Sequence, residues 1–142
     1  MPRLVRHEDL PRLTSTRDTR DRLDLVTEET FGTTDLRADR IIYHPGDTAA
    51  PHYHPGSKHF FFVLEGRGLL HAGAEDIDLS AGDVALVYED EVHWFENSHD
   101  EEFSFIELWV PAPSETIWVS EDQCRWAPQV PVIGVDSAAN PG

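Results

Sequence analysis

Four histidines with regular spacing constrain the fold of this chain more than any other feature of its sequence. They are His52, His54, His59 and His93. Two histidines separated by one residue on a strand point to the same face, because strand side chains alternate with a period of two. His52 and His54 therefore form a chelating pair. A metal site needs further ligands from other strands, and a β-barrel can bring His59 and His93 to this pair.

Glycine and asparagine positions extend these histidines into two motifs, GDTAAPHYHPGSKHFFFVLEG at 46–66 and GDVALVYEDEVHWFEN at 82–97. They resemble the two motifs of the cupin superfamily, GxxxxxHxHxxxxExxxxxxG and GxxxxxPxGxxHxxxN. The histidine spacings, the flanking glycines and Asn97 fit this pattern. His59 stands where the usual glutamate ligand would be, and Tyr88 and Asp90 replace the proline and glycine of the second turn. The resemblance implies an all-β fold, the cupin double-stranded β-helix or jelly-roll barrel.

The domain organisation follows from short runs of branched and aromatic residues that recur between turn residues, a pattern typical of barrels and sandwiches. The chain has 142 residues, which suits one domain with one core. We expect a single cupin domain over 1–142. Its barrel core covers about 25–120, an extended N-terminal arm covers 1–24, and a loose C-terminal tail covers 128–142.

Composition excludes several classes of partner. A formal net charge of −16 disfavours nucleic acid and anionic membrane surfaces, because their phosphates would be repelled. No apolar run approaches the length of about 18 residues needed to cross a bilayer, and the first residues lack the apolar stretch of a signal peptide. Cys124 is the single cysteine and excludes an intrachain disulfide. These features favour a cytoplasmic protein.

Strand parity predicts which side chains enter the barrel. In the strand expected over 59–65, the row that contains His59 must face inward to reach a metal, and the alternate row faces outward. The inner row is His59, Phe61 and Val63, and the outer row is Phe60, Phe62 and Leu64. Because the outer row is also apolar, we expect a homodimer to cover it. Parity does not decide which face of 103–110 lies inside. If Phe103 is inside, Glu107 and Trp109 are inside as well.

A single-domain cupin with a four-histidine site resembles the aromatic polyketide cyclases of bacterial pathways. That resemblance implies metal-dependent aldol-type ring closure and dehydration of a poly-β-ketone, either free or bound to a carrier protein. It implies one divalent metal per subunit on His52, His54, His59 and His93, with Zn preferred and Fe, Ni or Mn as alternatives. We expect Glu107, Tyr43 or Tyr53 to act as acid or base, and Phe61, Phe95 and Trp109 to bind the substrate.

The exchange of a glutamate for His59 separates this function from its alternatives. Four neutral histidines leave a divalent ion with a site charge of plus two, which favours redox-neutral polarisation of a carbonyl. If His59 turns away, the site has three histidines. A dioxygenase with Fe or Mn acting on a diketone or phenolic substrate, and a non-enzymatic cupin that binds a small molecule, remain as alternatives. Few basic residues lie near the motifs, which disfavours a sugar-phosphate isomerase.

Overall fold

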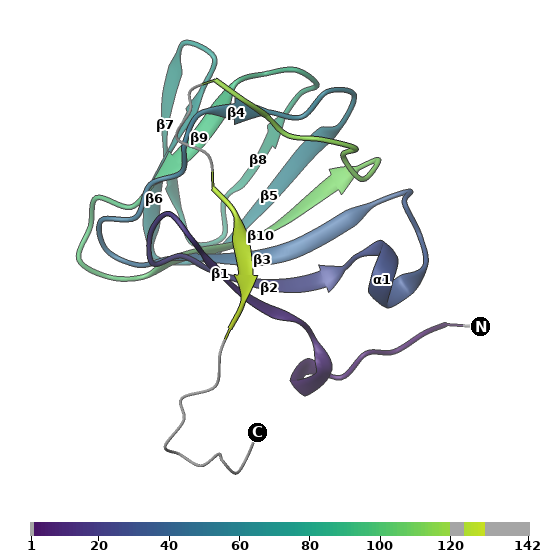
Figure 1. The fold of residues 1–142 in the computed structure, drawn as a ribbon. Helices are drawn as coiled ribbons and strands as arrows, with labels where there is room; N and C mark the ends of the chain where they lie inside the picture. The colour runs from purple at the N-terminus through teal and green to yellow at the C-terminus, as the bar shows by residue number, and fades with distance from the viewer. Residues whose placement is uncertain (1, 120–123, 130–142) are drawn as a thin grey trace, which may run out of the picture.

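The short apolar runs form two antiparallel sheets that pack face to face in the computed structural model, which describes residues 2–119 and 124–129 (Figure 1). The larger sheet has the strand order β12-β1-β2-β3-β10-β5-β8, and the smaller has the order β11-β4-β9-β6-β7. The strands are β1 (Arg12–Ser15), β2 (Asp21–Val26), β3 (Arg37–Tyr43), β4 (His52–Tyr53), β5 (Lys58–Glu65), β6 (Arg67–Ala72), β7 (Glu75–Ser80), β8 (Val84–Val87), β9 (His93–Glu96), β10 (Phe103–Val110), β11 (Ile117–Trp118) and β12 (Trp126–Pro128). The expected all-β jelly roll is confirmed.

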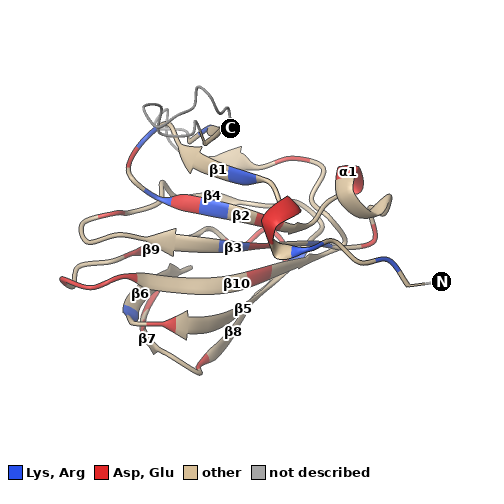
Figure 2. Ribbon diagram, turned by 90° about the horizontal axis from the view of Figure 1, so that it is seen from below, with Lys and Arg blue, Asp and Glu red and all other residues tan. Residues whose placement is uncertain are grey.

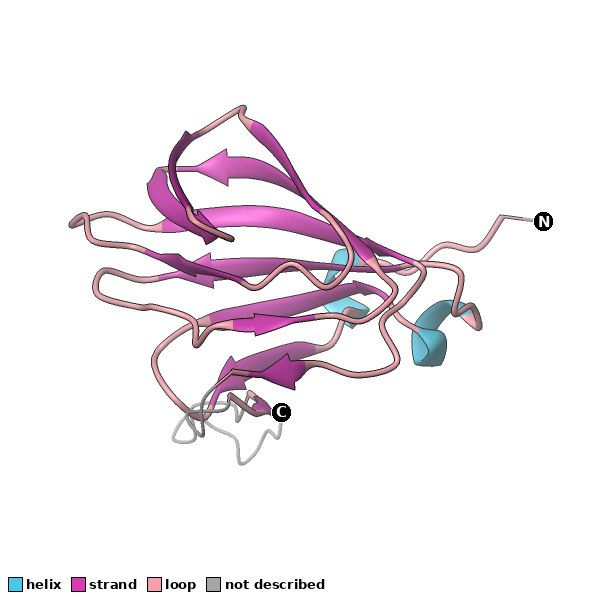
Figure 3. Ribbon diagram, turned by 90° about the horizontal axis from the view of Figure 1, so that it is seen from above, coloured by secondary structure: helices cyan, strands magenta, loops and turns pink. Residues whose placement is uncertain are grey.

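Helical structure is marginal in this fold. Among the described residues, a 3-10 turn, η1 (His7–Asp9), and a single-turn helix, α1 (Glu28–Phe31), lie at one side of the sheets (Figure 3). No helix in the described part of the chain is long and apolar enough to cross a membrane. Nearly all described side chains are therefore positioned by strands and by the loops between them.

The hydrophobic core lies between the two sheets and is rich in aromatic rings. Phe61 on β5, Phe105 on β10 and Phe95 on β9 pack with ring centroids 4.5–5.4 Å apart, in tilted or edge-on arrangements that aromatic pairs favour. The inner row predicted for β5 is buried, and β10 also turns Phe105 and its alternate residues inward. The parity question left open for 103–110 is thus decided, and Glu107 and Trp109 face the interior.

The N-terminal segment contributes more structure than the sequence pattern indicates. The expected arm over 1–24 contains η1 and β1, and β2 begins at Asp21, so the larger sheet starts well before residue 25. Strand β2 mixes Leu23 and Leu25 with Asp21, Arg22 and Asp24, and these charged residues hide its periodicity. At the other end, β12 pairs with β1, and Gln129 N–H donates to Arg12 O at 3.0 Å. Residues 130–142 of the expected tail lie outside the described residues.

The motif turns show why particular residues occupy them. Gly66 has φ of 73°, and a Cβ there would lie 2.0 Å from the carbonyl oxygen of Glu102, so no other residue fits without movement of the backbone. Asp90 takes the place of the family's glycine at φ of 64°, a left-handed conformation that aspartate adopts more readily than most residues. The buried Asn97 side chain donates to Tyr43 O and Glu101 O and so locks the end of β9.

The outer face of the larger sheet is apolar where β8, β5 and β10 lie side by side. Cross-strand neighbours there are Phe60 with Leu86 and Leu108, and Phe62 with Val84 and Ile106. The exposed fraction of Phe62 is 38%, of Leu86 44% and of Val84 60%. The outward row predicted from parity is therefore confirmed, and it extends over two further strands.

Candidate metal centre

The chelating histidine pair lies on the inner face of the smaller sheet. His52 begins β4, His54 follows that strand, and their ring centroids are 5.0 Å apart. His93 begins β9 and is the direct cross-strand partner of His52, with ring centroids 4.6 Å apart. One ligand nitrogen from each of His52, His54 and His93 lies within 4.8 Å of the others. Three histidines are therefore positioned to bind a metal ion.

His59 reaches the same place from the larger sheet. It is 2% exposed, and its Nδ1 lies 3.3 Å from His93 Nε2. The cross-strand neighbour Trp109 stacks on the His59 ring, with 4.3 Å between the centroids. His59 Nε2 lies 2.8 Å from Glu107 Oε1. The side chain thus does not turn away from the other histidines, although its second nitrogen is held by a carboxyl group.

Hydrogen bonds to backbone carbonyls determine the tautomers of two of these rings. His52 Nδ1 lies 2.7 Å from Ala50 O, and His93 Nδ1 lies 2.9 Å from Glu91 O. A carbonyl oxygen only accepts, so Nδ1 of each ring carries the proton and donates it. The Nε2 atoms of His52 and His93 therefore have free lone pairs that face the interior of the site.

Side chains contact the other two rings, His54 and His59. His54 Nδ1 lies 3.2 Å from the hydroxyl oxygen of Thr116, while its Nε2 is buried with no hydrogen-bond partner among the described residues. The Glu107 carboxylate accepts from His59 Nε2, which leaves the lone pair on Nδ1 pointing at His93. Two lone pairs at 3.3 Å repel each other unless a cation lies between them. This donor set fits a metal ion.

Burial keeps all four rings in the neutral form that binds metals. It lowers the pKa of His52 to about 3 and the pKa of His54 to about 2, and it lowers the pKa of His59 and His93 well below the usual value. The neighbouring histidines add to each shift, because a second imidazolium would be repelled. A proton shared between His59 and His93 is therefore disfavoured, and a metal ion is the cation that suits the site.

A cavity of about 370 Å³ opens from the histidines between the two sheets. Of the residues expected at the site, the cavity is lined by His52, His54, His59, His93, Tyr43, Phe95, Glu107 and Trp109. Phe61 does not line it; this ring is fully buried and packs beneath His59, with centroids 4.0 Å apart. Tyr53 does not line it either, because the alternation that turns its two histidine neighbours inward turns Tyr53 away. Tyr53 is therefore not placed to act as acid or base.

A buried carboxyl pair lies beside His59 in the cavity wall. Asp39 on β3 is the direct cross-strand partner of Glu107 on β10, and burial raises the pKa of both groups; the charge of Glu107 raises that of Asp39 further. Two neighbouring carboxyl groups resist simultaneous ionisation, while the charges of Arg22 and Arg37 act in the opposite direction and lower both pKa values. Asp39 was not expected at the site, although it shares the inward face of β3 with Ile41 and Tyr43, which period two reveals.

The arginines and tryptophans of the cavity also escaped the sequence analysis. They are Arg20, Arg22, Arg37, Arg125, Trp118 and Trp126. Arg20, Arg22, Arg125 and Trp126 belong to β2, β12 and the segments that lead into them, at the far side of the larger sheet from β5. No motif marks these residues, and only the tertiary pairing of β12 with β1 brings the two ends of the chain to one wall.

Comparisons with known proteins agree with this fold and site. The cupin domain family matches residues 39–111, which is about half of the chain and contains all four histidines. The chain belongs to the cupin family. It is 36% identical over 78 residues to the polyketide synthase CurC of Streptomyces cyaneus, covering 55% of this chain and 51% of that protein. It is 31% identical over 67 residues to an oxalate-binding protein of Thermotoga maritima, covering 47% and 55%.

Solved structures resemble the whole barrel at lower identity. The crystal structure of a predicted oxalate decarboxylase from Thermotoga maritima superposes with a TM-score of 0.66 at 22% identity, covering 77% of this chain and 99% of that one. At this identity the likeness shows the fold alone. The chain spans about half the length of the curated relatives that it matches. These relatives are named for different functions, so the function of this chain must be inferred from its site.

Acid should destabilise the metal-free protein through these histidines. Their pKa values are lowered in the folded chain, whereas the unfolded chain takes up protons near pH 6.5. Stability is therefore lost progressively as the pH falls from about 6.5 toward 3, by up to about 1.4 kcal/mol per pH unit for each neutral histidine. We expect urea unfolding of metal-stripped His54→Gln to depend less on pH between 6.5 and 5 than unfolding of the wild type. The exposed His7→Gln is the control, and equal slopes for all three proteins would contradict the assignment.

Proposed function

We propose that this chain is a metal-dependent polyketide cyclase that closes a ring by an aldol-type reaction and removes water from a poly-β-ketone. One observation carries the proposal: neutral imidazoles with no carboxylate among them converge at the end of a cavity whose wall contains a buried pair of carboxyl groups, Asp39 and Glu107. The identity with CurC, a polyketide synthase protein, supports the same substrate class. A small molecule, free or attached to a carrier protein, is the partner that this cavity suits.

His52, His54 and His93 would hold one divalent ion per subunit, with His59 as the fourth ligand. Two nitrogens that bind one tetrahedral Zn at 2.0–2.1 Å lie about 3.3–3.4 Å apart. The distance from His59 Nδ1 to His93 Nε2 agrees with this value. Zn is the preferred ion, and Fe, Ni or Mn suit the same nitrogen ligands less specifically. When bound, the ion supplies Lewis acidity that polarises a substrate carbonyl.

The chain's own groups then have distinct tasks. Phe95 and Trp109 contribute aromatic rings to the cavity lining against which a polyketone can pack. Burial raises the pKa of Glu107 above its ordinary value, which suits a general base for the CH2 between two carbonyls. Burial also raises the pKa of Tyr43, so this phenol keeps its proton and can donate a hydrogen bond to an oxygen that gains charge. Proton removal, carbon–carbon bond formation and loss of one water consume no oxidant.

The metal ligands can be tested by substitution. His52→Ala and His54→Ala should each remove the metal nearly completely, since each belongs to the chelating pair. His59→Ala should weaken binding less, by roughly ten- to a hundredfold, because three ligands remain. Metal analysis of the purified proteins and the coordination spectrum of a Co-loaded sample measure these effects, with the exposed His7→Ala as the control. If His59→Ala changes neither content nor spectrum, the site has three histidines.

The chemistry can be tested without knowing the natural substrate. A Zn-loaded preparation should cyclise a poly-β-ketone as fast under nitrogen as in air, and it should exchange an activated CH2 proton with solvent deuterium. Glu107→Gln should slow this exchange by roughly 10²–10⁴-fold while the metal content stays intact, since Glu107 is the proposed base. Stoichiometric oxygen uptake, or activity restored only by Fe(II) or Mn(II), would establish the dioxygenase instead.

We also propose that the apolar outer face of β8, β5 and β10 is covered by a second copy of the chain. Soluble monomers rarely leave so continuous an apolar patch exposed. Light scattering at micromolar concentration should give a dimer, and Phe62→Arg should shift it to a monomer. Ile77→Arg on β7 is the matched control, because Ile77 is 37% exposed and Phe62 38%. A wild-type chain that is monomeric at these concentrations would reject this interface.

A further inference from the structure

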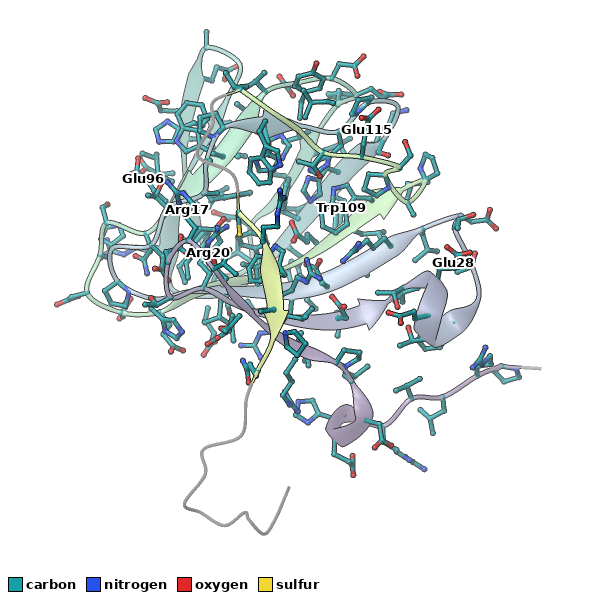
Figure 4. The ribbon with its side chains drawn as sticks, in the orientation of Figure 1. Arg17, Arg20, Glu28, Glu96, Trp109 and Glu115 are labelled. Carbon is teal, nitrogen blue, oxygen red and sulfur yellow. The ribbon has the colours of Figure 1, made fainter. Side chains whose placement is uncertain are left out.

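Arg20 is a buried arginine held in one orientation at the cavity wall. It ends the turn between β1 and β2 and is 5% exposed (Figure 4). Its Nε donates to both carboxylate oxygens of Asp18 at 2.9 Å. Its Cζ lies 5.3 Å from the ring centroids of Tyr43 and of Trp126. A carboxylate and two aromatic rings therefore fix the plane of the guanidinium, which binds planar anions best when it is held rigid.

The turn that carries Arg20 is itself anchored to the barrel. Thr19 N–H and its hydroxyl donate to Asp47 Oδ1 at 3.1 and 2.8 Å, and His44 N–H donates to the other oxygen of Asp47 at 2.8 Å. Asp47 is 4% exposed and lies in the loop after β3. The turn therefore cannot move away from the cavity without breaking buried charge-assisted hydrogen bonds.

One nitrogen of this arginine has no hydrogen-bond partner. Arg20 Nη2 is buried and unpartnered among the described residues, and so is Nε1 of Trp109 in the same cavity wall. Buried donors are nearly always satisfied, and a rigid one that faces a cavity is available to an acceptor on a ligand. Both of these groups donate and cannot accept, so the ligand must offer oxygen acceptors.

Arginines gather at this wall, although the chain has a formal net charge of −16. Arg20, Arg22, Arg37 and Arg125 line the cavity. Asp18 pairs with Arg20, and Asp24 pairs with Arg22 and Arg37, so most of this charge is balanced; basic and acidic segments lie side by side on β2 (Figure 2). A ligand oxygen is therefore held by local hydrogen-bond donors of the wall and not by a net positive field.

We propose that Arg20 forms a subsite for the anionic oxygen of a 1,3-dicarbonyl compound, either the carboxylate of a β-keto acid or the enolate of a β-diketone. The subsite deepens the proposed function, on which it rests, by naming the part of the polyketone that is held while its other carbonyls face the histidines. Arg20 and Trp126 lie outside residues 39–111, the part that the cupin family matches. Substrate choice is thus set by the turn before β2 and by β12, and metal binding by the barrel.

Binding to the metal-free full-length chain tests the subsite apart from catalysis. Acetoacetate and acetylacetone serve as probes, with acetone as the neutral control, and calorimetry gives the affinity. Acetoacetate should bind saturably, and Arg20→Met should weaken it at least tenfold. Arg20→Lys should restore only part of the affinity, because a lysine keeps the charge and loses the planar fork. Arg40→Met is the matched control, since Arg40 pairs with Glu65 at 2.8 Å outside the cavity.

The two probes separate the two sources of charge. Arg20-dependent binding of acetoacetate alone assigns a carboxylate, and Arg20-dependent binding of acetylacetone assigns an enolate. If Arg20→Met does not fold, the double variant Asp18→Asn with Arg20→Met replaces it in the assay, because it also removes the half-buried carboxylate that loses its Arg20 partner. Equal affinity in wild type and the Arg20 variants, or no binding of either probe to the wild type, overturns the subsite. Binding that depends on Arg20 without cyclisation by the Zn-loaded protein would reject the cyclase and keep the subsite.

Discussion

The mutual repulsion of imidazole lone pairs is the constraint on which the rest of this structure depends. Each ring is turned inward by a bond at its other nitrogen, to Ala50 O for His52 and to Glu91 O for His93. Burial then prevents protonation, which would otherwise relieve the repulsion. A protein interior that brings neutral acceptors together in this way is stabilised when a cation binds between them. The strand pairing that aligns His52 with His93 therefore makes sense as part of a metal site.

The glutamate ligand of the cupin motif is replaced by His59 in this chain, and a carboxyl group from another strand, Glu107 on β10, lies behind the histidine ring. His59 occupies the ligand place, and Glu107 lies behind it at 2.8 Å. A carboxylate in that second position orients the ring and increases its basicity without lowering the charge of the metal site. Asp39 and Glu107 are cross-strand partners, and burial raises the pKa of both, so this pair is suited to take up and release a proton close to the cavity. With a histidine in place of glutamate at position 59, the ligands of the proposed metal site are neutral, and the acid–base group is a separate residue, Glu107.

Periodicity and motif spacing were sufficient for the fold and for the cluster of His52, His54 and His93, since both depend on local rules, and the role of His59 as a ligand stays a prediction. The period of two placed Phe61 and Val63 inside and Phe60 outside, and the same rule should have removed Tyr53 from the candidate acids and bases. It could also have found Asp39. Arg20 could not be found in this way, because its position depends on Asp47 and Trp126, which are distant in sequence and are joined to it only by tertiary contacts.

The barrel residues follow from periodicity and the residues at the sheet edge do not, and this difference has a physical origin. A barrel strand with one buried face allows only one register, so its ligands are fixed as soon as its pattern is fixed. The turn before β2 and the strand β12 pack at the edge of the larger sheet, where many sequences can form the same pairing. Such edges can change their side chains without disturbing the histidines on β4, β5 and β9. A cupin barrel can therefore keep one metal chemistry while the residues at this edge, Arg20 and Trp126 among them, determine which oxygen-rich molecule is admitted.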